Sequence, residues 1–148
     1  MTVPDLLKTA RPGSMITRKG GRKVIRTLVV DDDPDFRLLV RVWLEKFEPH
    51  RYTIVGEAGS GTEAGVLVDE CQPDLVLLDL TMPATDPLET IADLKGRCPR
   101  MLLVVVSGYE PGDRLEVTVA HGADGYVEKG ASFERLRAEV DAVLARAG

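Results

Sequence analysis

The stretch that decides the fold is TLVVDDDPDFR, residues 27–37, in which an apolar run leads directly into three consecutive carboxylates. Residues 28–30, Leu-Val-Val, are typical of a buried strand. Asp31, Asp32 and Asp33 repel one another, and each is costly to remove from water. A positively charged group is therefore expected at the end of this strand.

Alternating strand and helix signals extend outward from this stretch over the rest of the chain. Between short β-branched or leucine-rich runs, and again after the last of them, apolar residues recur at helical spacing. Five such repeats predict an α/β fold, a five-stranded parallel sheet with helices on both faces. The runs that predict strands lie at residues 24–30, 52–57, 74–78, 101–106 and 125–127.

The charge of the chain is unevenly distributed. The 148 residues carry a net charge of −5, and their 44% hydrophobic content is ordinary for one globular domain. Residues 1–23 hold six basic side chains and one acidic one, so the remainder sums to about −10. We therefore predict a flexible basic extension at 1–23 and one domain at 24–148, whose acidic character argues against direct binding of nucleic acid.

Two further features concern the compartment. Cys71 and Cys98 lack the spacing of a disulfide framework or a zinc site. No apolar run approaches the roughly 20 residues that cross a bilayer, and the N-terminus lacks the apolar core of a secretory signal. A cytoplasmic protein without a membrane partner is expected.

The residues at the carboxyl ends of the predicted strands suggest a site. The first strand ends at the three aspartates, the third at Asp79 and the fourth at Ser107, and the fifth leads into Lys129. Each alone has an ordinary structural explanation, such as an aspartate that caps a helix or a solvated lysine. Because the carboxyl ends of parallel strands meet at one edge, together they indicate a site for a hard divalent cation.

Four motifs carry a resemblance to a known family. They are VVDDDPDFR, DLVLLDLTMP, VVVSGY and GADGYVEKG, and in this order and spacing the chain resembles, from residue 24 to about 146, the receiver domain of two-component response regulators. The resemblance implies a doubly wound, flavodoxin-like (βα)5 fold with strand order 2-1-3-4-5. It also implies a signalling domain rather than an enzyme, which promotes only its own phosphorylation and dephosphorylation.

The resemblance also assigns the residues of a phosphorylation site. It implies that Asp79 is the phosphoacceptor and that Lys129 is the lysine of the site. Mg²⁺ is the implied cofactor, bound directly by Asp32, Asp79 and the backbone carbonyl of Thr81, and by Asp31 through water. Such an ion would relieve the repulsion among the aspartates.

A second group of residues is implied to transmit the signal. Ser107 resembles the switch hydroxyl and Tyr126 the switch aromatic, whereas Thr81 and Tyr109 hold the positions that tune dephosphorylation. The resemblance implies that phosphorylation changes the surface of the fourth helix, fifth strand and fifth helix. Implied partners are a histidine kinase or phosphotransfer protein, a downstream protein or output domain, and a second copy after phosphorylation.

The chain shows three departures from the family pattern, of which the variable pair Thr81 and Tyr109 is one. Pro87 stands where the family commonly has glycine, which predicts an unusual loop because proline fixes φ and removes a donor. Gly130 follows the site lysine, where the family most often has a proline with a cis bond. Since the chain ends soon after the fifth predicted helix, it is expected to be a stand-alone receiver or the receiver part of a longer regulator.

Two other hypotheses stay open at this point. A haloacid-dehalogenase-like phosphohydrolase shares the apolar strand followed by Asp-x-Asp, but has Thr or Val where this chain has Asp35 and leaves DLTMP unexplained. A receiver-fold interaction module that is not phosphorylated is the second. Incubation with a small phosphodonor separates the three hypotheses. Steady turnover indicates the phosphohydrolase, a single stable adduct indicates the receiver, and no reaction indicates the unphosphorylated module.

Overall fold

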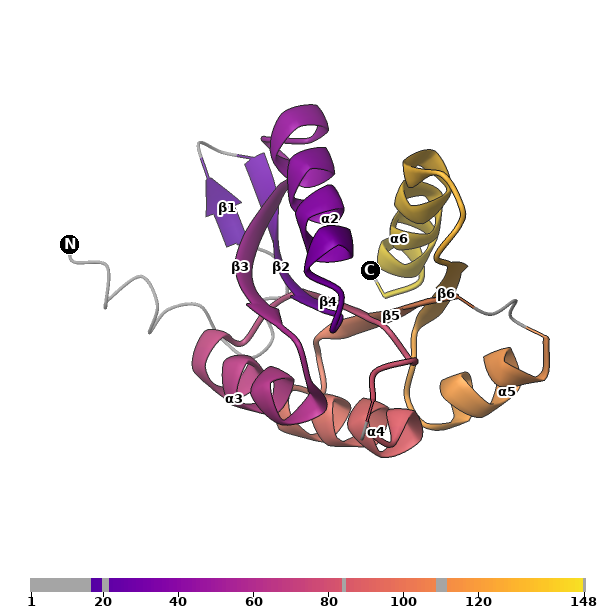
Figure 1. Ribbon diagram of the computed structural model, residues 1–148. Helices are drawn as coiled ribbons and strands as arrows, with labels where there is room; N and C mark the ends of the chain where they lie inside the picture. Colours follow the sequence, from indigo (N-terminus) through magenta and orange to yellow (C-terminus); the bar gives the residue numbers. More distant parts are fainter. Residues whose placement is uncertain (1–16, 20–21, 84, 109–111, 148) are drawn as a thin grey trace.

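A computed structural model describes residues 17–19, 22–83, 85–108 and 112–147. These residues form six strands and five helices, arranged as one sheet between two layers of helices (Figure 1). The strands are β1 (Thr17–Lys19), β2 (Arg22–Val30), β3 (Tyr52–Ala58), β4 (Leu75–Leu78), β5 (Leu102–Ser107) and β6 (Gly125–Glu128). The helices are α2 (Pro34–Phe47), α3 (Gly61–Cys71), α4 (Pro87–Arg97), α5 (Gly112–Ala120) and α6 (Phe133–Ala147).

The five parallel strands have the order β3-β2-β4-β5-β6. This order confirms the predicted 2-1-3-4-5 arrangement. The register aligns the strand ends, because Val30 pairs with Leu78 and Leu78 with Val105. At the end of β5, Ser107 pairs with Glu128 of β6. The residues that follow these strands therefore lie at the same edge of the sheet.

Two apolar clusters lie on opposite faces of the sheet. In β2, Leu28 and Val30 belong to one cluster and Val29 to the other, as the two-residue period of a strand requires. The first cluster includes buried residues of α3 and α4, and the second includes those of α2 and α6. The near-continuous apolar strands at the centre of the sheet are therefore buried on both faces, as in a doubly wound fold.

The N-terminal boundary differs from the prediction. Thr17–Lys19 pairs antiparallel with Arg22–Val24, so β1 and the start of β2 lie within the predicted extension 1–23, and the sheet is not entirely parallel. The prediction relied on apolar periodicity, which a short pair of antiparallel strands does not need. The two glycines between these segments are a hairpin signal that could have revealed it. Residues 1–16 of the predicted extension lie outside the described residues.

The start of α4 corrects a second expectation. Asp86 is the N-cap residue, and its side chain accepts hydrogen bonds from the backbone N–H groups of Leu88 and Glu89 at 3.0 and 3.3 Å. Pro87 is the first residue of the helix, where its fixed φ suits the helix and its missing N–H has no cost. The departure predicted to make an unusual loop is thus an ordinary helix start.

Within the described part of the chain, no helix has the length and apolar character needed to span a membrane.

Candidate functional site

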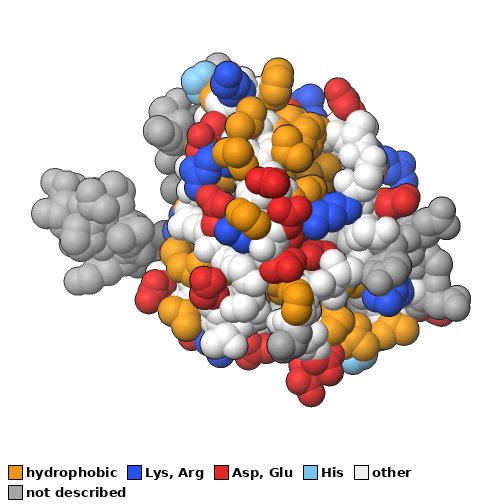
Figure 2. All heavy atoms as spheres, in the orientation of Figure 1, with side chains coloured by type: hydrophobic (Ala, Val, Ile, Leu, Met, Phe, Trp, Pro, Cys, Tyr) orange, Lys and Arg blue, Asp and Glu red, His pale blue; other side chains and the backbone are white. Residues whose placement is uncertain are grey.

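Three carboxylates meet at the carboxyl edge of the sheet. Oxygen atoms of Asp31, Asp32 and Asp79 all lie within 4.8 Å of one another. Asp31 and Asp79 are 1% and 2% exposed, whereas Asp32 is exposed. Figure 2 shows acidic side chains gathered near the centre of this face, with a basic side chain beside them. The structure therefore brings Asp79, which follows β4, together with Asp31 and Asp32, which follow β2.

Asp31 is the buried member that follows β2. Its Oδ1 accepts a hydrogen bond from the backbone N–H of Asp33 at 2.8 Å, and its Oδ2 lies 2.7 Å from Nζ of Lys129. Burial is the main cause that raises the pKa of Asp31, and the nearby charge of Asp79 adds to it, while Lys129 and the Asp33 N–H oppose the increase. An additional cation at this carboxylate would favour its charged form.

Asp79 leaves β4 at the centre of the edge. The hydroxyl of Thr81 donates to its Oδ1 and Oδ2 at 2.8 and 3.0 Å, and the Thr81 N–H donates to Oδ1 at 3.1 Å. These contacts orient the carboxylate with donors from its own loop. They involve the N–H and hydroxyl of Thr81, so metal binding by the Thr81 carbonyl stays a prediction.

Lys129 supplies the positive group expected beside the aspartates. Its backbone N–H donates to the Ser107 carbonyl at 2.6 Å, which holds the residue next to the end of β5. Its Nζ is 2.7 Å from Asp31 but 3.9 Å from Asp79 Oδ2, and it lies 4.5 Å from the ring centroid of Phe36. The sequence analysis did not predict this cation–π contact. The available signal was the position of Phe36, which lies in the first helical turn after the three aspartates.

The two predicted switch residues lie on neighbouring strands. Ser107, the last residue of β5, is fully buried, and Tyr126 on β6 is 6% exposed and belongs to an apolar cluster. Tyr126 pairs with Val105, two residues before Ser107. Their proximity is compatible with the predicted coupling, but their roles stay predictions. Tyr109, the predicted tuning residue, lies outside the described residues.

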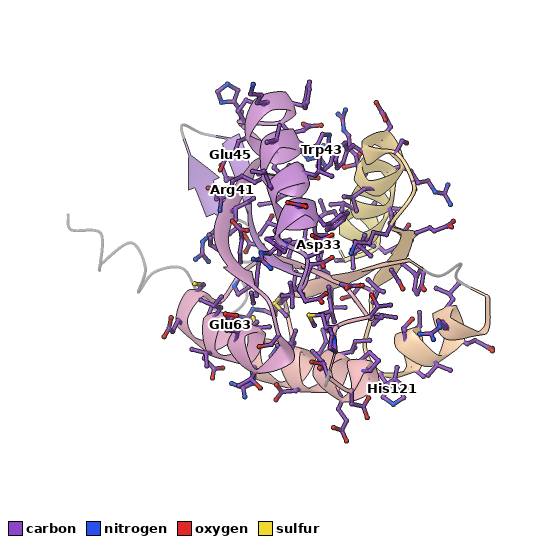
Figure 3. The ribbon with its side chains drawn as sticks, viewed as in Figure 1. Asp33, Arg41, Trp43, Glu45, Glu63 and His121 are labelled. Carbon is purple, nitrogen blue, oxygen red and sulfur yellow. The ribbon has the colours of Figure 1, made fainter. Side chains whose placement is uncertain are left out.

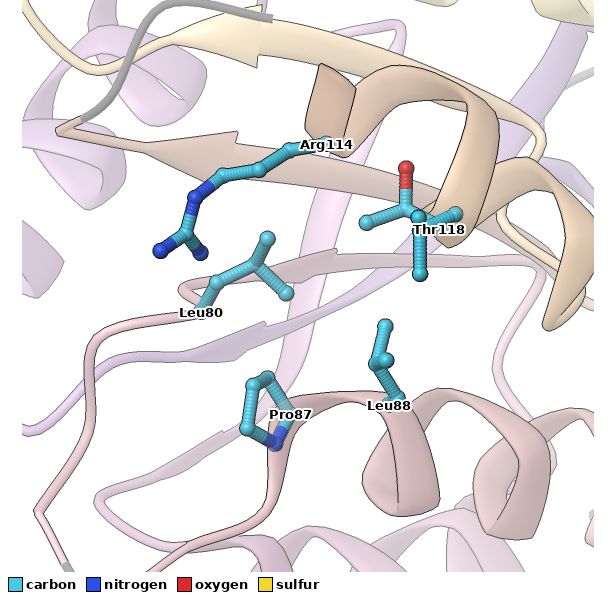
Figure 4. Close-up of a pocket in the computed structure, with 6 residues that line it drawn as sticks. Leu80, Pro87, Leu88, Arg114 and Thr118 are labelled. Atoms are coloured by element: carbon cyan, nitrogen blue, oxygen red, sulfur yellow. The ribbon is translucent and has the colours of Figure 1, made fainter.

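An apolar pocket of about 300 Å³ opens beside the site, between the start of α4 and the helix α5 (Figure 4). Leu80, the residue after Asp79, contributes to its wall. The other lining residues are Pro87, Leu88, Arg114, Val117 and Thr118.

Comparisons with known proteins identify the family. The family model described as the response regulator receiver domain matches residues 27–141. The chain therefore belongs to the receiver domain family of two-component response regulators. This assignment supports the first of the three hypotheses from the sequence, and these findings lend no support to a phosphohydrolase.

Individual relatives agree with the family. The chemotaxis protein CheY of Halobacterium salinarum is 32% identical over 104 residues, which cover 70% of this chain and 83% of CheY. The transcriptional regulatory protein YdfI of Bacillus subtilis is 34% identical over 120 residues, 80% of this chain and 54% of YdfI. A LuxR-family two-component response regulator from Aurantimonas has a crystal structure similar to this one, with a TM-score of 0.75 and 29% identity. That match covers 82% of this chain and 86% of the other.

The chain spans about half the length of several curated relatives that it matches, namely 49% to 56% of the first three. The similarity to these longer regulators therefore concerns their receiver part.

Proposed function

We propose that this receiver domain accepts a phosphoryl group at Asp79 from a phosphohistidine of a kinase or phosphotransfer protein in the cytoplasm. The observation that carries the proposal is the arrangement at the sheet edge. Three carboxylates lie within 4.8 Å of one another, and one ammonium group lies 2.7 Å and 3.9 Å from two of them. The family relationship supports the same assignment.

The donor set fits a magnesium ion. Mg²⁺ prefers oxygen ligands, retains several waters and uses few protein carboxylates, and the cluster offers carboxylate oxygens with one exposed member. Asp32, Asp79 and the carbonyl of Thr81 would hold the ion directly, and Asp31 through water. When bound, the ion supplies positive charge against the oxygens of the phosphoryl group.

The chain's own residues then account for the transfer. A carboxylate oxygen of Asp79 attacks phosphorus, and the bond from phosphorus to the donor's nitrogen breaks. The electron pair of that bond stays on the histidine ring, which takes one proton from solvent and leaves as neutral imidazole. Lys129, 3.9 Å from Asp79 Oδ2, needs only a small movement from Asp31 to contact the phosphoryl oxygens. Thr81 and Tyr109 hold the sequence positions that, by the family resemblance, tune the attack of water on the acyl phosphate.

Phosphorylation also acts on the surroundings of the site. The new phosphate oxygens accept a hydrogen bond from Ser107, and the movement of that residue favours a different packing of Tyr126. The surface of α5, β6 and α6 changes as a result, which alters contacts with a downstream protein, an output domain or a second copy of the domain.

Intact mass after incubation with acetyl phosphate tests the chemistry. We expect a single phosphate adduct that requires Mg²⁺, is lost in excess chelator and is absent in Asp79→Asn. Asp33→Asn is the matched control, because Asp33 lies beside the cluster, is not a member of it, and asparagine caps a helix equally well. An adduct in Asp79→Asn would contradict the assignment, continuous turnover would indicate a phosphohydrolase, and no reaction would indicate an unphosphorylated module.

Backbone amide shifts in the presence of Mg²⁺ and beryllofluoride test the switch. We expect shifts to extend from the site to α5, Tyr126 and the start of α6, because packed elements switch between discrete arrangements. Ser107→Ala should retain Mg²⁺ binding and lose much of the distant response. Shifts confined to the loops of Asp32, Asp79 and Lys129 would show instead that a partner reads the phosphate directly.

A further inference from the structure

Arg37, in the first turns of α2, connects three parts of the molecule. Its Nη1 donates a hydrogen bond to the backbone carbonyl of Asp31, and its Nε donates to Oε1 of Glu57 on β3 at 3.3 Å. The side chains of Arg37 and Glu57 are 21% and 26% exposed, so this ion pair is partly shielded from solvent. The guanidinium group thus joins the helix and the neighbouring strand to the backbone of the acidic loop.

The hydrogen bond from Arg37 means that both backbone polar groups of Asp31 are held by hydrogen bonds. The N–H of Asp31 donates to the Ala58 carbonyl at 2.9 Å, and its carbonyl accepts from Arg37. The carbonyl of Asp31 and the N–H of Asp32 belong to one planar peptide group. Arg37 therefore orients the peptide from which the exposed carboxylate of Asp32 projects.

A second arginine provides a natural comparison. Arg41 lies one turn further along α2 and donates through Nε to the same Glu57 at 2.9 Å. It also contacts Glu45 at 3.0 Å, and both residues are labelled in Figure 3. Among the described residues these carboxylates are its hydrogen-bond partners, and it makes no bond to Asp31. The two arginines share an anchor but differ in their contact with the acidic loop.

We propose that Arg37 is a positioning residue for the metal-binding loop, which holds Asp31 and Asp32 in the geometry that binds Mg²⁺. This role rests on the proposed function, in which these carboxylates hold the ion. Glu57 orients the guanidinium group of Arg37 from β3, whereas Arg41 shares the Glu57 carboxylate without contacting the acidic loop. Arg37 does not itself contact the ion or the phosphoryl group.

The charge of Arg37 makes the proposal sharply testable. A cation near the carboxylates repels a metal ion, so electrostatics alone predicts that its removal strengthens Mg²⁺ binding. A positioning role predicts the opposite, because a loop without its hydrogen bond must be ordered when the ion binds. The sign of the change in affinity separates the two effects.

Mg²⁺ titrations by calorimetry and by backbone amide shifts test the role in the full chain. We expect Arg37→Gln to weaken Mg²⁺ binding about tenfold, whereas Arg41→Gln stays within about twofold of the wild type. Arg37→Lys should recover part of the affinity, because its ammonium can donate to the Asp31 carbonyl. In the metal-free protein, the amide shifts of Asp32 and Asp33 should change in Arg37→Gln and not in Arg41→Gln.

The outcomes distinguish this role from the proposed function. If the wild type binds Mg²⁺ and Arg37→Gln binds it equally tightly or more tightly, the positioning role is overturned and the proposed function stays in place. Absence of Mg²⁺ binding to the wild type would overturn both. If Arg37→Gln does not fold, the Mg²⁺ affinities of Glu57→Gln and Arg37→Lys test the role instead. Wild-type Mg²⁺ affinity in both of these variants would also overturn the positioning role.

Discussion

The two helices α2 and α5 border the site from different sides and are held very differently (Figure 1). α2 has 14 residues and buries Val40, Trp43 and Leu44 against the sheet. α5 has 9 residues, and among residues 114–120, whose side chains are described, only Thr118 is buried. The helix after the acidic loop is thus anchored by several buried side chains, whereas the described part of the helix after Ser107 buries only one.

Both sequence and packing explain this contrast. α2 begins with an aspartate cap and a proline, and Trp43 stacks on Phe133 of α6 with ring centroids 5.0 Å apart. In α5 the apolar side chains of Leu115, Val117 and Val119 are 41%, 42% and 51% exposed. α5 therefore obtains little stabilisation from burial.

The difference suits the two tasks proposed for the site. A metal-binding loop needs carboxylates in a fixed geometry, and a firmly packed helix maintains it. A switch needs an element whose alternative positions differ little in free energy, and weakly buried elements have that property. The metal side of the site is thus rigidly supported, while the side that would respond to phosphate is held weakly.

The largest expected effect comes from the anchor of α2. Trp43→Ala should lower the free energy of unfolding by about 3–5 kcal/mol, because it removes a large buried ring and leaves a cavity. Urea unfolding followed by circular dichroism measures it. Val119→Ala on α5 is the matched control and should change stability by less than about 0.5 kcal/mol. Comparable losses in the two variants would contradict the contrast.

A second effect concerns local opening. Native-state hydrogen exchange should show amides of α5 opening at free energies at least about 2 kcal/mol below those of the buried face of α2. The physical reason is the small apolar area that α5 buries on the body of the domain. Equal protection of the two helices would show that other contacts hold α5 and would remove the basis for its proposed movement.

A smaller effect tests how tightly the α2 side is packed. Tyr52 lies beside Trp43 with ring centroids 6.1 Å apart, and in the described part of the chain its hydroxyl has no hydrogen-bond partner. Burial raises the pKa of Tyr52 to about 12, with smaller contributions from the charges of Asp141 and Glu48. The phenol therefore resists ionisation more strongly in the folded protein than in the unfolded chain.

The sign of the pH dependence follows from that increase. Because the folded pKa lies above the unfolded value, the stabilising contribution is complete below about pH 10 and is lost as pH rises toward 12. Relative to Tyr52→Phe, the wild type should lose about 1 kcal/mol between pH 9 and pH 11. Urea unfolding of both proteins measures the difference, and a difference that does not vary with pH would contradict the burial of the hydroxyl.

Much of the candidate site was predictable because its signals are local. Asp79 and Ser107 stand at the ends of apolar runs, and the structure places both at the carboxyl edge of the sheet. Lys129 follows the short strand β6 and lies beside Asp31, as the accumulation of negative charge required. β1 was missed because a three-residue strand with backbone pairing has no periodicity to detect.

The sequence by itself determined the alternation of strands and helices, the parallel sheet and the set of polar residues at the strand ends. The alternation and the parallel sheet follow from apolar runs, from the 3.6-residue period of helices and from the connections that such elements permit. Only the tertiary structure decided that Lys129 lies nearer to Asp31 than to Asp79, and that Arg37 joins Glu57, 20 residues away, to the backbone of Asp31. Such contacts depend on side-chain directions across strands and helices that are distant in sequence, and no local pattern encodes them.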